Sequence, residues 1–160
     1  MTSDTIAAIA TPSGRGGIGV VRVSGPEAVA IARRCLARDE PLEPRVATFV
    51  RVVEPGRVEI GARGAVVDQA VVTWFAAPHS YTGEDVVEIS GHGSPVLLQH
   101  IVELLIGAGA RLAEPGEFTL RAYLNGRIDL AQAEAVADLV DAVTPLQARA
   151  ATRPQVPGCD

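Results

Sequence analysis

Residues 5–24 read TIAAIATPSGRGGIGVVRVS, and this stretch decides the class of fold. Residues 5–10 have the composition of a buried strand, and residues 19–24 form a second strand pattern in which Arg22 alternates with valines. Residues 14–19 match the dinucleotide fingerprint G-x-G-x-x-G, in which the third glycine opens a helix that faces a pyrophosphate. Because these glycines lead into a strand, a tight turn between strands is favoured over a nucleotide site.

Further along the chain, β-branched runs alternate with helical patterns. Helices are predicted at residues 27–36 and 96–105, the first behind a capping-box pattern in SGPE. Further strands are predicted at residues 46–53, 58–60, 66–76 and 86–90. This order predicts an α/β chain of the α+β type, with helices packed on a mixed β-sheet.

The segment PGEFTLRAYLNGRIDLAQAEAVADLVDA, residues 115–142, predicts two helices. Asn125-Gly126 closes the first, and Asp129 starts the second. The second carries one apolar stripe, made of Ile128, Ala131, Ala135, Leu139 and Val143. This stripe must pack against a partner, so we expect one domain over residues 1–119, the start of a truncated helical domain over 120–144 and an irregular tail over 145–160.

Composition excludes several classes of protein. The net charge is −5, which argues against a chain that wraps nucleic acid by itself. The chain contains no lysine, so it has neither a G-x-x-x-x-G-K-[ST] phosphate loop nor a Schiff-base lysine. Cys35 and Cys159 are interpreted as free thiols in a reducing compartment. Neither a signal peptide nor an apolar run of about 18 residues is visible, so we expect a cytoplasmic protein without membrane contact.

Few residues are candidates for chemistry. Glu88 lies inside an apolar strand, where it is either an exposed-face residue or a ligand-binding carboxylate, and Arg22 has the same two interpretations. His92, between two glycines after a strand, either bonds neighbouring backbone or reaches a ligand. Arg15 meets an anionic ligand tail or points to water. The histidines lack metal-ligand spacing, and no residue is predicted to be catalytic.

Three segments together resemble the N-terminal region of the bacterial tRNA modification GTPases, the MnmE (TrmE) family. They are DTIAAIATPSGRGGIGVVRVSG at residues 4–25, PHSYTGEDVVEISGHGSPV at residues 78–96 and EPGEFTLRAYLNGRIDLAQAEAVADLVDA at residues 114–142. The resemblance implies a tetrahydrofolate-binding domain similar in fold to the folate domains of the aminomethyltransferase type, followed by the first helix of a helical domain.

The resemblance also implies ligands and partners. The ligand is a 5-formyl- or methylene-type tetrahydrofolate, which supplies a one-carbon unit for C5 of the tRNA wobble uridine. Family folate contacts match Arg22, Glu88 and Arg127, with Arg15 and His92 as possible accessory residues; arginine at position 127 replaces the expected lysine, which keeps the charge and changes the shape. The implied partners are a second copy of the chain and a FAD-dependent tRNA modification protein, with tRNA bound weakly or not at all by this chain.

GTP, Mg²⁺ and K⁺ belong, in the family, to a GTPase domain whose motifs are absent from these 160 residues. We therefore expect no GTP hydrolysis by this chain alone. Two interpretations of its function follow. One is a folate-binding domain of a tRNA-modifying GTPase, present as a fragment or as a truncated gene product. The alternative is a truncated, non-catalytic dimerisation module that keeps the fold.

Overall fold

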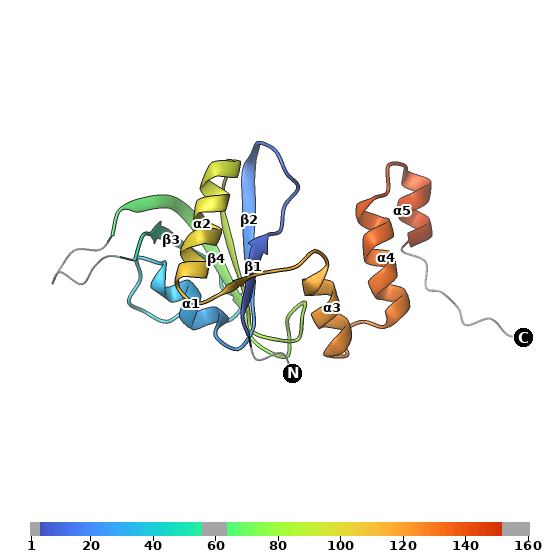
Figure 1. Ribbon diagram of the computed structural model, residues 1–160, viewed down its shortest axis with the longest axis horizontal. Helices are drawn as coiled ribbons and strands as arrows, with labels where there is room; N and C mark the ends of the chain where they lie inside the picture. The colour runs from blue at the N-terminus through green and yellow to red at the C-terminus, as the bar shows by residue number, and fades with distance from the viewer. Residues whose placement is uncertain (1–3, 56–63, 152–160) are drawn as a thin grey trace, which may run out of the picture.

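The computed structural model describes residues 4–55 and 64–151, and its centre is one six-stranded sheet (Figure 1). The strands are β1 (Ile6–Ile9), β2 (Gly16–Ser24), β3 (Thr48–Val53), β4 (Val66–Phe75), β5 (Val86–Gly93) and β6 (Arg111–Leu112). They lie in the order β3-β4-β5-β2-β1-β6. Only the β1–β6 pair is parallel within this sheet, so the predicted mixed sheet is confirmed.

Two helices, α1 (Ala28–Arg34) and α2 (Pro95–Gly107), cover one face of the sheet. The strands alternate, so one set of side chains enters the core between sheet and helices and the other set points away from it. The centre of this core is fully or almost fully buried and contains Val21, Val23, Ile31, Val87, Ile89, Ile101 and Leu105. Arg22 and Glu88 fall on the alternate positions, and their side chains therefore lie on the face away from α1 and α2.

Three helices follow the sheet: α3 (Glu117–Leu124), α4 (Leu130–Val140) and α5 (Pro145–Ala151). They lead away from the sheet one after another, and α4 and α5 stand apart from it (Figure 1). Asp129 caps α4 as predicted, because its side chain accepts from the Gln132 amide while the Gln132 side chain accepts from the Asp129 amide. Helix α4 contacts α3 and α5, but none of its residues is buried, so the predicted apolar stripe is only partly covered by the described residues.

The structure corrects several details. The prediction of an irregular tail from residue 145 is wrong over Pro145–Ala151, which form α5: proline is well tolerated at a helix start, where its missing N–H is not needed. The rest of that tail, and the strand predicted at residues 58–60, lie outside the described residues. The capping box predicted at residues 24–27 does not form, because the Ser24 hydroxyl bonds to Thr82 and Glu84 instead. The short edge strand β6 was not predicted.

Candidate functional site

Arg22 and Glu88 face each other across the centre of the sheet, in the antiparallel pair β2–β5. Arg22 donates from Nε to Glu88 Oε1 at 2.9 Å, and its Nη2 lies 2.8 Å from the same oxygen. The two side chains are 25 % and 27 % exposed. Within the described part of the chain no hydrogen bond reaches Glu88 Oε2, so this carboxylate keeps one oxygen available on a half-open face.

Two aromatic rings lie close to the Arg22 guanidinium. Its central carbon is 5.2 Å from the ring centre of Tyr81 and 5.5 Å from that of Phe118, which is within the range of cation–π attraction. Tyr81 belongs to the turn between β4 and β5, and Phe118 to α3. A 2.9 Å hydrogen bond between the Tyr81 hydroxyl and Thr119 Oγ1 joins that turn to α3. The charged pair is therefore bordered by planar side chains from two separate elements.

A buried arginine holds α3 in this position. Arg121 is 1 % exposed, and its two Nη atoms donate to the backbone and carboxylate of Asp4, to Glu84 and to Glu117. Removing one partner from such a group leaves a charge buried without compensation, so the cluster is costly to disrupt. Arg121 Nε is buried with no hydrogen-bond partner in the described structure. The cluster ties α3 to the chain before β1 and to the turn that carries Tyr81.

Arg111, on β6, completes this cluster from its exposed side. Its guanidinium donates to Glu117 at 2.6 Å and to Asp4 at 2.8 Å. The hydrogen bond from Arg111 is the main reason that the pKa of Glu117 falls to about 2, with burial acting in the opposite direction. The same arginine is the main cause of a lowered pKa at Asp4. Both carboxylates are thus held in their charged form at neutral pH.

Arg127 lies beside the Tyr81 turn. Its side chain packs against Gly83: a β-carbon placed on that glycine would stand 3.1 Å from Arg127 Cγ. The neighbouring Asn125 donates from Nδ2 to the Thr82 carbonyl at 2.8 Å, which fixes the end of α3 to the same turn. The structure brings Arg22 and Glu88 into contact and places Arg127 near their aromatic border, but it records no contact between Arg127 and either of them.

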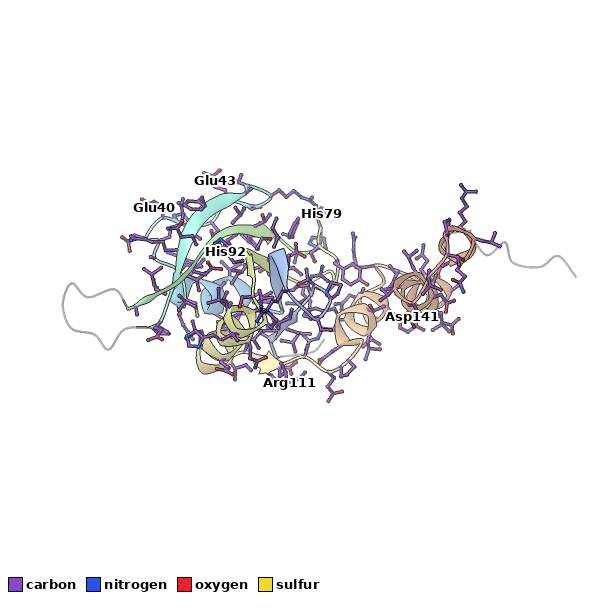
Figure 2. All side chains as sticks on the ribbon, turned by 90° about the horizontal axis from the view of Figure 1, so that it is seen from above. Glu40, Glu43, His79, His92, Arg111 and Asp141 are labelled. Atoms are coloured by element: carbon purple, nitrogen blue, oxygen red, sulfur yellow. The ribbon has the colours of Figure 1, made fainter. Side chains whose placement is uncertain are left out.

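His92 and Arg15 lie toward another end of the β2–β5 pair (Figure 2 for His92). His92 lies four positions after Glu88 along β5, roughly 13 Å in an extended strand. Arg15 precedes Gly16, which pairs with Gly93, and it lines a shallow pocket of about 250 Å³ formed with the glycine-rich turn and Leu98. Neither residue is brought to the Arg22–Glu88 pair.

The partner of His92 is a buried carboxylate on β4. Asp68, 5 % exposed, accepts from the His92 backbone amide at 2.9 Å and lies 2.7 Å from the ring atom Nδ1. Burial raises the pKa of Asp68, but the bonds from His92 and from the Gln69 amide outweigh it, and the net pKa is lowered. Gly91 leaves the space that this carboxylate fills, since a β-carbon there would lie 2.5 Å from Asp68 Oδ2.

Sequence reasoning did not identify Tyr81, Phe118, Asp68 or Arg121. Asp68 carried the same signal as Glu88, an acidic residue within a β-branched run. Tyr81 and Phe118 gave no local signal, because a single aromatic residue in a turn or a short helix is ordinary. In the described residues, no group of three or more histidine, cysteine, aspartate or glutamate side chains is arranged to hold a metal ion. None of the described helices has the length and apolar character to span a bilayer.

The architecture defines the class of protein: an α+β domain whose mixed sheet carries two helices on one face and a paired arginine and glutamate on the other, continued by a helical arm. Residues 5–127 match the family described as "GTP-binding protein TrmE N-terminus". The chain is 58 % identical over 153 residues to a tRNA modification GTPase MnmE of Koribacter versatilis, covering 94 % of this chain and 32 % of that protein. It is 53 % identical over 153 residues to the protein of that name from Legionella pneumophila strain Corby, covering 96 % and 32 %.

A third relative, the tRNA modification GTPase MnmE of Aromatoleum aromaticum, is 54 % identical over 150 residues, covering 94 % of this chain and 31 % of the relative. The chain belongs to the TrmE (MnmE) family and corresponds to its N-terminal domain. It spans about a third of the length of the curated relatives that it matches. The family resemblance inferred from the three sequence segments is therefore confirmed.

Proposed function

We propose that this chain binds a tetrahydrofolate derivative of the 5-formyl or methylene type on the sheet face that carries Arg22 and Glu88. The observation that carries the proposal is the Arg22–Glu88 pair itself: a half-exposed carboxylate with one available oxygen, beside a cation and two aromatic rings. In this role the chain acts as the folate domain of a tRNA-modifying GTPase, and the bound folate supplies a one-carbon unit for the wobble uridine.

The chemistry of these residues fits a reduced pterin. The pterin ring presents an exocyclic amino group and a ring N–H side by side, and a carboxylate accepts two such parallel hydrogen bonds. Tyr81 and Phe118 offer apolar faces to a planar ring. Arg22 and the nearby Arg127 supply positive charge to a ligand whose tail carries carboxylates. His92, roughly 13 Å along β5, and Arg15, beyond the Gly16–Gly93 pair, remain accessory candidates for that tail.

The further partners follow from the family and are part of the same proposal. We propose that two copies of the chain associate, and that a FAD-dependent protein acts with the full-length family members. The half-open sheet face and the partly covered stripe of α4 leave apolar side chains exposed that a partner surface would cover, among them Phe49, Val71 and Leu139. Sedimentation of the chain at tens of micromolar measures the first of these associations, and a monomer would contradict it.

Calorimetric titration with 5-formyl-tetrahydrofolate tests the proposed ligand. We expect saturable binding in the micromolar range by the purified chain, which corresponds to about 8 kcal/mol. Glu43→Gln serves as the matched control, because Glu43 is an exposed carboxylate on the loop between α1 and β3 and its loss should leave binding unchanged. Absence of heat and of absorbance change at millimolar ligand would leave the chain as an association module without a folate site.

A further inference from the structure

The contact between Arg22 and Glu88 uses an oxygen that the proposed ligand also needs. Two nitrogens of Arg22, Nε and Nη2, donate to Oε1 of Glu88, so only Oε2 is left without a donor. A ring with two parallel N–H donors needs both oxygens of the carboxylate. The ligand and Arg22 therefore compete for the same acceptor.

The competing groups are chemically alike. The amino group and adjacent ring N–H of a 2-amino-4-oxopyrimidine form, with the carbon between them, a guanidine-like unit. A guanidinium is also planar, also donates through neighbouring N–H groups and also lies favourably against aromatic rings. Arg22 makes both kinds of contact here, to Glu88 at 2.8–2.9 Å and to the rings of Tyr81 and Phe118 at 5.2 and 5.5 Å.

We infer that the Arg22 guanidinium occupies the position on Glu88 that the 2-amino-4-oxopyrimidine edge of the ligand takes. This inference rests on the proposed function. Binding is then an exchange, in which the guanidinium leaves Oε1 of Glu88 and the pterin edge takes both oxygens and lies against Tyr81 and Phe118. The displaced Arg22 stays at the site as a cation for the anionic part of the ligand.

The exchange predicts that one substitution at the site increases the affinity for the pterin. Removing a residue that positions Glu88 or contacts the pterin should weaken pterin binding. Removing a residue that competes with the pterin for Glu88 should strengthen pterin binding. Methionine at position 22 keeps the unbranched apolar stem and removes both the charge and the donors, so Arg22→Met separates these two roles.

The probe is 6-methyltetrahydropterin, which carries the pterin edge and lacks the benzoyl-glutamate tail. We expect Arg22→Met to bind it at least about threefold more tightly than the parent, since a partly exposed ion pair no longer has to be broken. Arg51→Met is the matched control, because Arg51 lies exposed on β3, two strands from Glu88, and its loss removes the same charge. Equal or weaker binding by Arg22→Met, or no binding by either chain, would overturn the exchange.

The aromatic border gives a second set of variants. Tyr81→Leu and Phe118→Leu should each weaken the tetrahydropterin several-fold, because stacking area is lost. Tyr123→Leu is the control on the same helix, since Tyr123 is 40 % exposed and has no recorded contact with Arg22. If all three substitutions leave the affinity unchanged, the ring does not lie against Tyr81 and Phe118.

A direct readout uses the parent chain and the intact ligand. The ¹H–¹⁵N signal of Arg22 Nε, assigned by its loss in Arg22→Met, should move and exchange faster with water when 5-formyl-tetrahydrofolate saturates the site. An unchanged signal at saturation would mean that Arg22 stays on Glu88, and the exchange would be wrong while the proposed function stands. If the parent does not bind the folate at all, the proposed function fails instead.

Discussion

Arg121 and Asp4, 117 residues apart in the chain, are joined by two hydrogen bonds of 2.9 Å each. One runs from Arg121 Nη1 to the Asp4 carbonyl, and the other from Nη2 to the Asp4 carboxylate. Helix α3 is thereby attached to the residues that lead into β1. Helix α3 also carries Phe118, whose ring lies beside Arg22. The position of this ring therefore depends on a contact between the two ends of the described sheet domain.

Arg121→Met should destabilise the chain by about 3–5 kcal/mol, because Asp4, Glu84 and Glu117 would be left close together without their buried cation. Urea unfolding followed by circular dichroism measures this loss. Arg33→Met is the control, because Arg33 makes an exposed bond to the Asp39 carbonyl. A loss below about 1 kcal/mol at Arg121 would show that the cluster contributes no more than a surface ion pair.

Acid should unfold the chain partly through Glu117. The pKa of this carboxyl is lowered from 4.5 to about 2, chiefly by Arg111, so the folded state favours the charged form. The resulting stability is fully present above pH 4.5 and is lost as the pH falls from there toward 2. We expect the melting temperature of the parent to fall steeply over this interval. The decline should be shallower in Glu117→Gln, and parallel curves for the two chains would contradict the assignment.

Gly91→Ala should destabilise the sheet by about 1–3 kcal/mol. The new β-carbon would lie 2.5 Å from Asp68 Oδ2, and Asp68 would have to leave the amide and ring of His92. Gly107→Ala provides the contrast, because nothing lies within 4 Å of a β-carbon there and alanine is favoured over glycine in a helix by about 1 kcal/mol. Thermal melts should therefore shift in opposite directions for the two variants.

Glu88→Gln should bind 5-formyl-tetrahydrofolate more weakly by about 2 kcal/mol or more. The substitution replaces one acceptor by a donor, which would face an N–H of the pterin and leave it unpaired. The fold should persist, because glutamine is nearly isosteric and the side chain is 27 % exposed. Unchanged affinity together with an unchanged melting curve would assign Glu88 to the surface of the sheet rather than to a binding site.

The chain alone should hydrolyse no GTP. Its 160 residues contain neither lysine nor a phosphate loop, so a γ-phosphate would find no cradle and no lysine counter-charge. Phosphate release by a preparation freed of other GTPases should equal the buffer blank. Turnover above that blank, retained through a further purification step, would contradict the prediction.

The central strands were predictable because their residues are β-branched and apolar, and the same alternation made Arg22 and Glu88 conspicuous. Their pairing was not predictable, since it depends on the register between segments 66 residues apart. The bond between Asp68 and His92 escaped prediction for the same reason. Sequence reasoning sees which residues are unusual in their own segment, and it does not see what the fold places opposite them.

Helix ends were harder to predict than helix interiors. Asp129 and Gln132 form their capping box as the spacing indicates, whereas the equivalent pattern at residues 24–27 fails. The two sites differ because tertiary hydrogen bonds compete with the local cap at Ser24. Its hydroxyl bonds to Thr82 and Glu84, 58 and 60 residues further along the chain. Local capping bonds of about 1 kcal/mol are readily replaced when tertiary partners are available.

The strand order also determines which strand edges are unpaired while the chain is being synthesised. β2 ends at Ser24, but β5, its neighbour in the sheet, is complete only at Gly93. At about 5–20 residues per second, roughly 4–14 s of synthesis pass between these two points. During this time one edge of β2 has β1 as a partner and the other has none, and unpaired edges of this kind join readily to other chains. The nascent polypeptide is therefore most in need of a chaperone before β5, which carries Glu88, has paired with β2.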